Sequence, residues 1–425
     1  MMENQRLETG VKAEYDTAKT IIMHTPGEEI FMGTLQGMAA LYDKDPIDSI
    51  LIAKQHEKYI NTLKQNNINV ITVKETLLSG TLDKNNNKIL GNDLDNLIKF
   101  AESCVQIVYP IELSLERLQD MKLYKARSMR AAHPTDLVRM ILQRPSAYIH
   151  KCSENTEFIA ESYKLHPLMN MHFLRDQQIT TDKGIVIGKM NSVQRRLETD
   201  VTKYIFNKLE LPIVGEITGS GRLEGGDFIP CGDYAFIGQG HRTNAEGIKQ
   251  LLESNALGYK EIAVVKDSFM QQDEMHLDTY FNIAGPNKAV ILEDRIDHYA
   301  KNNFVKTDPR KKTTVDIYQF VGDGYKKKKI MSFQKYLASK GFSVKDDSLI
   351  PLTKKEQLNY GCNFLTIAAN KVIAVDIVDD DDRYGVDYIN KMRKSGIDVI
   401  PIPFNEFVKT YGAPHCATQV IYRSK

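Results

Sequence analysis

The sequence lacks long apolar runs and has almost no surplus of charge. No stretch of its 425 residues approaches the roughly 18 apolar residues that cross a bilayer. Residues 1–6 are polar and lack the apolar centre of a signal peptide. The chain carries 56 basic and 55 acidic residues, so no overall field recruits nucleic acid or an anionic membrane. We therefore expect a soluble globular protein without a nucleic-acid or membrane partner.

Cysteine is also scarce. The five thiols, at 104, 152, 231, 362 and 416, are odd in number and widely scattered, with no pairs spaced as in zinc sites. This pattern predicts reduced thiols and a cytoplasmic location. Cys231 and Cys362 lie in strand-like surroundings and are expected to be core residues.

The N-terminal part predicts a strand at 18–24, a helix at 52–65 with helically spaced apolar residues, and a strand at 68–73. From 77 to 148 apolar residues repeat at spacings of three and four, which predicts an inserted helical subdomain. Length alone would allow two or three domains. We expect one catalytic α/β unit over 1–425 that carries this insertion.

A strand–strand–helix–strand unit recurs after the insertion. Two copies align almost without gaps, at 226–229, 234–238, 244–255 and 262–265, and at 362–365, 371–375, 382–394 and 399–402. A third copy has a strand at 184–188, a helix at 193–208 and a strand at 213–214, and a fourth has strands within 275–292 and a helix at 328–340. The N-terminal strand–helix–strand makes a fifth. Repeats that cannot bury themselves alone are expected to stack around a shared axis.

The predicted first strand of each copy carries polar residues where a buried strand should be apolar. These residues are Asp176, Glu224 with Asp227, His276 with Asp278, and Asn363. If they converge on the axis, the buried acids need a cation or a metal between them. Hard carboxylates together with a soft thiolate suit no single metal well, whereas a planar guanidinium matches two carboxylates. The sequence favours a guanidinium over a metal, without excluding the metal.

One cysteine near the C-terminus gives this acidic centre a chemical use. Cys416 lies in the turn-rich stretch 411–419. A lone cysteine is more often an inert core side chain. A bound guanidinium, however, would lower the pKa of the thiol and present its central carbon to the thiolate. His276 is expected on the same strand face as Asp278, where it would act as acid and base, with Glu224 holding its tautomer.

Six motifs resemble, in order, those of the arginine deiminases: FLRD at 173–176, RRLET at 195–199, LEGGDF at 223–228, GHRTN at 240–244, MHLDT at 275–279, and the terminal GAPHCATQ. The resemblance covers essentially the whole chain. It implies a five-bladed α/β propeller of pentein type. It further implies hydrolysis of L-arginine to L-citrulline and ammonia through a covalent cysteine intermediate, without cofactor or metal, and we expect a homo-oligomer.

Carried over by position, the resemblance implies a nucleophile at Cys416, an acid/base at His276, and a guanidinium clamp of Asp176 and Asp278, with Glu224 near the histidine. Its substrate-binding positions are Asn170, Phe173, Arg195, Asp227 and Arg242, and the resemblance implies that Asn170, Arg195 and Arg242 hold the amino-acid end of arginine.

The chain also departs from the family pattern. Gln177 replaces a common proline, and Tyr411 replaces an arginine that usually reaches the substrate carboxylate. A hydrolase acting on another guanidino or ureido compound therefore stays open, as do an arginine dihydrolase and a catalytically idle arginine-binding relative. The charged runs 326–329 and 379–382 are expected to be solvated surface.

Overall fold

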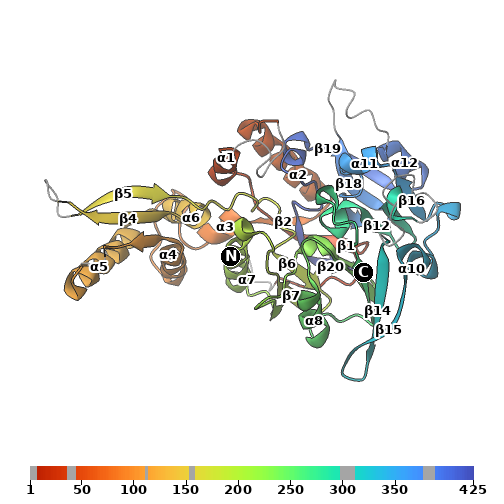
Figure 1. The fold of residues 1–425 in the computed structure, drawn as a ribbon. Coiled ribbons are helices and arrows are strands. Elements are labelled where there is room, and N and C mark those ends of the chain that lie inside the picture. Colours follow the sequence, from red (N-terminus) through yellow and green to blue (C-terminus); the bar gives the residue numbers. More distant parts are fainter. Residues whose placement is uncertain (1–6, 36–44, 111–112, 153–157, 297–311, 377–387) are drawn as a thin grey trace.

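The computed structural model describes residues 7–35, 45–110, 113–152, 158–296, 312–376 and 388–425. The expected mixed α/β class is confirmed, because helices and short strands alternate along the chain (Figure 1). The described strands form six separate small sheets, and none of these sheets closes on itself.

Five of the sheets share one pairing pattern, in which an antiparallel pair is followed by a parallel pair. Their strands are β6 (Gln178–Thr181), β7 (Gly184–Ile187) and β8 (Ile213–Glu216); β9 (Phe228–Cys231), β10 (Tyr234–Gln239) and β11 (Glu261–Lys266); β12 (Phe281–Gly285), β13 (Lys288–Leu292) and β16 (Leu349–Leu352); β17 (Leu365–Ala368), β18 (Lys371–Asp376) and β19 (Asp398–Pro403); and β20 (Gln419–Ser424), β1 (Thr17–Met23) and β2 (Asn69–Thr72). The predicted repeat is thus confirmed.

A helix makes each parallel connection, because parallel neighbours need a crossover. These helices are α7 (Glu198–Lys208), α8 (Ala245–Glu253), α10 (Phe333–Ser339), α12 (Tyr388–Lys394) and α2 (Ser49–Gln65). The fifth module joins both ends of the chain, since the C-terminal strand β20 pairs antiparallel with β1 (Figure 1). Adjacent modules meet mainly through their first strands, since β12 contacts β9 and β17, and β20 contacts β6; β17 also contacts β1, the middle strand of the fifth module.

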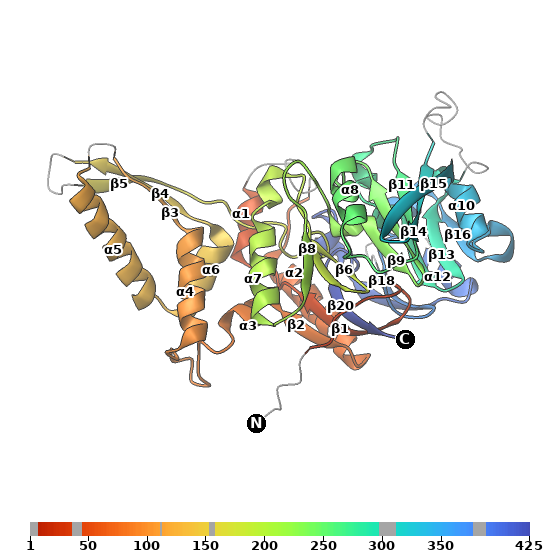
Figure 2. The ribbon, with the colours of Figure 1, turned by 90° about the horizontal axis from the view of Figure 1, so that it is seen from below.

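The insertion is less purely helical than predicted. Its helices are α3 (Val73–Leu78), α4 (Asn92–Cys104), α5 (Leu115–Ala131) and α6 (Pro134–Gln143). The same region also carries β3 (Gln106–Val108) and the start of β4 (Ser146–Lys151), which form a sheet with β5 (Phe158–Lys164). Such short strands give no clear alternation, and β4 finds its antiparallel partner only beyond residue 148. Figure 2 shows this segment projecting to one side of the other modules.

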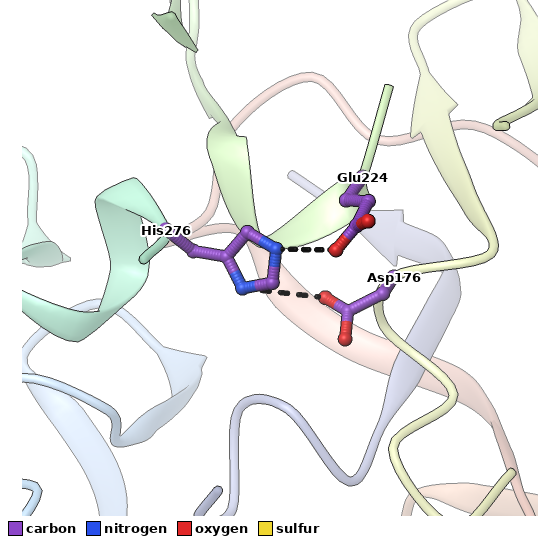
Figure 3. Close-up of side chains that lie close together, drawn as sticks. All are labelled: Asp176, Glu224 and His276. Carbon is purple, nitrogen blue, oxygen red and sulfur yellow. Dashed lines mark hydrogen bonds and ion pairs between the residues drawn. The ribbon is translucent and has the colours of Figure 1, made fainter. Parts of the chain in front are cut away.

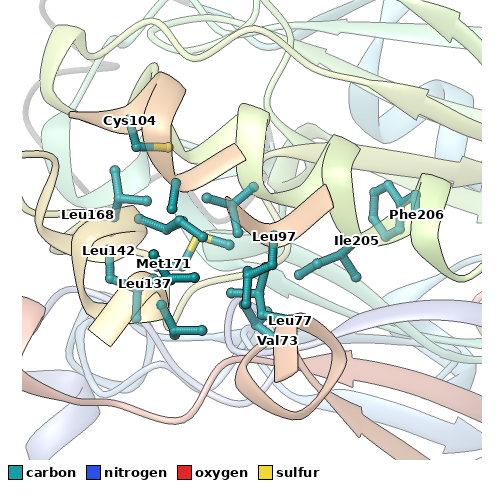
Figure 4. Close-up of a cluster of buried hydrophobic side chains, with 14 of the residues drawn as sticks. Val73, Leu77, Leu97, Cys104, Leu137, Leu142, Leu168, Met171, Ile205 and Phe206 are labelled. Atoms are coloured by element: carbon teal, nitrogen blue, oxygen red, sulfur yellow. The ribbon is translucent and has the colours of Figure 1, made fainter. Parts of the chain in front are cut away.

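Apolar packing attaches the projecting segment to the main body. Leu97 of α4 and Leu137 of α6 belong to one buried cluster with Leu77 of α3 and Ile205 and Phe206 of α7 (Figure 4). Burial of such side chains contributes about 1.5–3 kcal/mol each. Among the described helices, none combines the length and apolar character needed to cross a membrane.

The predicted helix at 328–340 is wrong in its first part. Residues 324–332 form β15, which pairs with β14 (Thr314–Val321) and extends the β9–β11 sheet. Lys327 of this strand lies 2.7 Å from the Asp316 carboxylate on β14, so cross-strand pairing overrides the helix propensity of the lysines. The run 326–329 is exposed, as expected. The run 379–382 and the start of the predicted helix at 382–394 lie outside the described residues.

Candidate active site

The polar residues expected to converge do not lie in strands. They lie in the turns that precede the first strand of each module: Asp176 before β6, Glu224 and Asp227 around the turn Gly225–Asp227 before β9, His276 and Asp278 around the turn Leu277–Thr279 before β12, and Asn363 before β17. The expected strand placement of His276 and Asp278 is therefore wrong. Turns leave the buried strands apolar and direct the polar groups toward neighbouring modules.

Three modules contribute to one buried cluster (Figure 3). His276 Nε2 donates a hydrogen bond to Glu224 Oε2 at 2.8 Å, and His276 Nδ1 lies 3.8 Å from Asp176 Oδ1. Burial lowers the pKa of His276, but Asp176, Glu224 and Asp227 outweigh burial and raise it to about 9. The imidazole is therefore protonated near neutral pH and able to donate a proton.

Two consecutive glycines permit this close packing. A Cβ on Gly225 would stand 2.0 Å from the Arg175 carbonyl oxygen, and one on Gly226 would stand 2.8 Å from the His276 ring. The Gly226 N–H also donates to Asp176 Oδ1 at 3.3 Å. The GG of the LEGGDF motif is thus explained by close approach of the Arg175 backbone and the His276 imidazole.

Cys416 enters from the loop before β20. Its Sγ lies 3.7 Å from Asp278 Oδ2, and its backbone N–H donates to Asn363 Oδ1 at 3.3 Å. Burial raises the pKa of the thiol, and the charges of Asp278 and Asp176 raise it further. A cation brought to this place would therefore favour the thiolate.

Cys416, His276 and Asp176 open onto one cavity of about 350 Å³. Its other lining residues are Asn170, Phe173, Ser192, Gln194, Arg195, Arg242, Gln272, Met275, Thr279, Thr410 and Tyr411. Glu224, Asp227 and Asp278 are at most 3% exposed and are not among the lining residues, but Asp278 Oδ2 lies 3.7 Å from the Cys416 thiol that lines the cavity. The structure thus brings Cys416, His276 and Asp176 together around a space open to a small molecule.

Asp227 has a structural contact. Its Oδ1 accepts the Leu277 N–H at 3.0 Å and so holds the turn that carries His276 and Asp278. Burial raises the pKa of Asp227 to about 6. Direct contact with substrate, implied by the resemblance, is not what this geometry favours.

Arg195 also differs from its expected part. Its Nη1 donates to Asp176 Oδ2 at 2.7 Å, its Nε to Glu198 at 3.0 Å, and its Nη2 to the carbonyl oxygens of Asn170 and Phe173. This guanidinium is bound by the protein itself and orients Asp176. Arg242, in contrast, is half-buried, lines the cavity and donates only weakly, to Met275 Sδ at 3.4 Å. Arg242 is the better placed of the two to bind a substrate carboxylate.

Two acceptors near the cavity have no hydrogen-bond partner among the described residues: Asn170 Oδ1 and Asp278 Oδ1. Buried acceptors without donors are destabilising unless a ligand supplies the donors. A guanidinium offers five N–H donors and a positive charge. These orphaned oxygens fit such a ligand.

A metal is the competing interpretation. Ligand atoms of Asp176, Glu224 and His276 lie within 4.8 Å of one another. However, Asp176 is already paired with the Arg195 guanidinium, and Glu224 is hydrogen-bonded to the His276 imidazole. The residues present fit a hydrogen-bonded proton donor better than a metal centre.

The sequence did not assign a role to His415, although it precedes Cys416 directly. His415 Nδ1 donates to Asp278 Oδ2 at 2.7 Å, and the fully buried ring shares this oxygen with the Cys416 thiol. Glu14, which approaches the other ring nitrogen, was also missed, because nothing in the sequence connects residue 14 with residue 415.

Comparisons with known proteins agree with the motifs. The sequence pattern of the arginine deiminase family matches residues 40–423. The arginine deiminase of Halobacterium salinarum is 24% identical, over 97% of this chain and 96% of its own length. That of Oenococcus oeni is 24% identical over 97% of each chain. The chain therefore belongs to the arginine deiminase family, and the family expected from the motifs is confirmed.

A solved structure supports the fold. The N-terminal domain of ArgZ, an arginine dihydrolase from cyanobacteria, superimposes with a TM-score of 0.51 at 12% identity, over 95% of this chain and 97% of that one.

Proposed function

We propose that this protein hydrolyses the guanidino group of L-arginine to give L-citrulline and ammonia, with Cys416 as the nucleophile. The observation that carries the proposal is the shared cavity of Cys416, His276 and Asp176, with Asp278 beside the thiol: its Oδ2 lies 3.7 Å from Sγ, and its Oδ1 has no partner among the described residues. Membership of the arginine deiminase family supports arginine as the substrate.

The first half-reaction follows from these positions. The guanidinium binds between Asp176 and Asp278, and its charge lowers the pKa of the thiol. The Cys416 thiolate forms a C–S bond with the central carbon, and the protonated His276 donates its proton to the departing nitrogen as the C–N bond breaks. Ammonia leaves, and a thiouronium remains on Cys416.

The second half-reaction returns the enzyme to its starting state. His276, now neutral, takes a proton from water while the oxygen bonds to the same carbon. The C–S bond then breaks as the new hydroxyl group loses its proton to solvent, which releases citrulline and the thiolate. The sum is the arginine guanidinium plus water giving citrulline plus ammonium, because the released ammonia takes up that proton, and no external oxidant or reductant is needed.

Product identification tests the proposal. Purified protein incubated with arginine should release ammonia and citrulline in equal amounts, and Cys416→Ala should abolish turnover while the melting temperature stays close to that of the wild type. Mass spectrometry of quenched wild type should find an adduct on the peptide that carries Cys416. Near wild-type turnover by Cys416→Ala would refute the nucleophile.

The same assay separates the other candidates. Ornithine with two ammonia molecules would indicate an arginine dihydrolase, and turnover of citrulline or agmatine alone would indicate another guanidino or ureido substrate. Tight arginine binding without any product would indicate an idle relative.

We further propose that the five similar modules form a five-bladed propeller around this site, in one catalytic unit that carries the insertion 77–148. The module contacts through β6, β9, β12, β17 and β1/β20 support this arrangement. A cytoplasmic location, supported by five free cysteines, and a homo-oligomeric state stay predictions.

A further inference from the structure

Behind Cys416 lies a buried row of ionisable side chains that brings together residues from both ends of the chain. Arg423 Nη2 on β20 donates to Glu14 Oε1 at 2.6 Å, and this oxygen lies 3.4 Å from His415 Nε2. The other ring nitrogen, Nδ1, donates to Asp278 Oδ2 at 2.7 Å. Each of these four side chains is at most 4% exposed.

The row leads to the reacting thiol. Asp278 Oδ2, which accepts from His415, is also the oxygen 3.7 Å from Cys416 Sγ. The other oxygen, Oδ1, has no partner among the described residues. The two oxygens of Asp278 are therefore not equivalent. Oδ2 accepts a hydrogen bond from His415, and Oδ1 is left for a ligand.

We propose that His415, with Glu14 and Arg423 behind it, is a positioning residue that fixes the Asp278 carboxylate for guanidinium binding and reduces its negative field at Cys416. This proposal rests on the function proposed above. His415 itself lies behind the cavity wall and does not reach a bound substrate.

Two physical effects support the role. The short bond to Nδ1 restrains rotation of the carboxylate, so Oδ1 keeps its direction without rearrangement on binding. A donor on Oδ2 also disperses charge that otherwise faces the thiol and opposes its ionisation. The other charged groups facing His415 and Cys416 are Glu14, Arg175, Arg423 and Asp176.

Hydrogen bonds of its backbone also fix the position of His415. Its carbonyl accepts from Arg175 Nε at 3.2 Å, and its backbone N–H donates to the Asn363 carbonyl at 3.2 Å. Burial raises the pKa of Glu14, but Arg423 and His415 outweigh it and lower it to about 2, so Glu14 stays charged. The ring therefore lies between two carboxylates, hydrogen-bonded to Asp278 through Nδ1, with Nε2 3.4 Å from Glu14.

Two nearly isosteric variants test the proposal. The amide nitrogen of asparagine can take the place of imidazole Nδ1, whereas that of glutamine can take the place of Nε2. His415→Asn thus keeps the bond to Asp278 and loses the approach to Glu14, and His415→Gln does the reverse. Melting temperatures show whether both variants fold.

The readout is the rate of iodoacetamide alkylation at Cys416 against pH, measured on the Cys416 peptide without substrate. We expect His415→Asn to keep a profile close to wild type and His415→Gln to shift it to higher pH, with kcat/KM for arginine falling roughly tenfold in the Gln variant, the loss expected for one charge-assisted hydrogen bond. Glu14→Gln should shift the profile in the same direction by less.

A control comes from a second buried pair away from the cavity, in which His24 Nε2 lies 2.8 Å from Glu29 Oε1. Glu29→Gln should change the melting temperature and leave the alkylation profile in place. Equal profiles for His415→Asn and His415→Gln, or a shift in the Asn variant alone, would overturn the proposal. Alkylation of Cys416 needs no turnover. If the protein failed to hydrolyse arginine, the proposed function would be refuted, but the alkylation profiles would still test the role of His415.

Discussion

Two buried histidine–glutamate pairs in this molecule share a distance and differ in charge. His276 Nε2 lies 2.8 Å from Glu224, and His24 Nε2 lies 2.8 Å from Glu29. The pKa of His276 is raised to about 9, whereas the pKa of His24 is lowered. Burial lowers both pKa values, so the difference lies in the neighbours.

The neighbours of His276 are three carboxylates from two other modules. Asp176, Glu224 and Asp227 together outweigh burial. At His24 the single carboxylate of Glu29 does not outweigh burial, and the nearby Lys74 lowers the pKa of His24 further. A buried pair is therefore no sign of a catalytic site by itself; the sign is the convergence of several acids from separate modules on one imidazole.

The largest effect is expected when each histidine is replaced. His276→Asn removes the proton donor and should lower kcat/KM for arginine by roughly 10²–10⁴-fold, the range of general acid–base groups. His24→Asn should leave kcat/KM within about threefold and lower the free energy of unfolding by about 1–3 kcal/mol. Steady-state kinetics measure kcat/KM, and urea unfolding measures the free energy of unfolding. Equal activity losses would show that the pairs do not differ in role.

Neutralising the two glutamates should sharpen the same contrast. Glu224→Gln keeps the shape and an acceptor oxygen but removes a charge that keeps His276 protonated. We expect kcat/KM near neutral pH to fall roughly tenfold, as for loss of a charge-assisted hydrogen bond. Glu29→Gln should affect only unfolding. Unchanged activity in Glu224→Gln would mean that Asp176 and Asp227 suffice.

The stability that each histidine contributes should depend on pH in opposite directions. His276, with a folded pKa of about 9 above the ordinary 6.5, contributes stability that is fully present below pH 6.5 and lost as pH rises through 9. In the free enzyme kcat/KM should fall over the same upper range, because the imidazolium is the proton donor. His24, with a lowered pKa, contributes stability that is present above pH 6.5 and lost as pH falls below it. The free energy of unfolding across pH for wild type, His276→Asn and His24→Asn measures both. If the free energy of unfolding of His276→Asn still falls at high pH, the loss belongs to another group.

The smallest effect is expected at Tyr411, which belongs to neither histidine pair. Tyr411 lines the cavity with an exposed fraction of 43% and a left-handed φ of 66°, a strain that arginine would share. Because Arg195 is bound by Asp176 and Glu198, Tyr411→Arg adds a cation next to Arg242 alone. KM for arginine should fall several-fold with kcat little changed, the result of uniform binding. Unchanged parameters on both arginine and agmatine would show that position 411 does not contact the substrate end.

Several features could be predicted from local patterns. The repeated strand–strand–helix–strand unit was visible because apolar periodicity reports which side of an element faces a core. The residues around the cavity were found through motifs that keep short spacings, such as EGGD, HLD and HC. Predictions failed where a partner distant in sequence decided the outcome. Residues 328–332 form a strand because β14 lies beside them, and 106–108 because β4 does.

By itself the sequence determined the five similar modules, the family, and the grouping of Cys416, His276 and the acids, since these depend on residue type and spacing. Only the tertiary structure decided how their charges are distributed. In the tertiary structure Arg195 is hydrogen-bonded to Asp176, and His415 to Asp278. His276 and His24, each paired with a glutamate, have pKa values shifted in opposite directions. The physical reason is that a buried charge depends on every group within a few ångströms, and those groups come from modules that lie far apart along the chain.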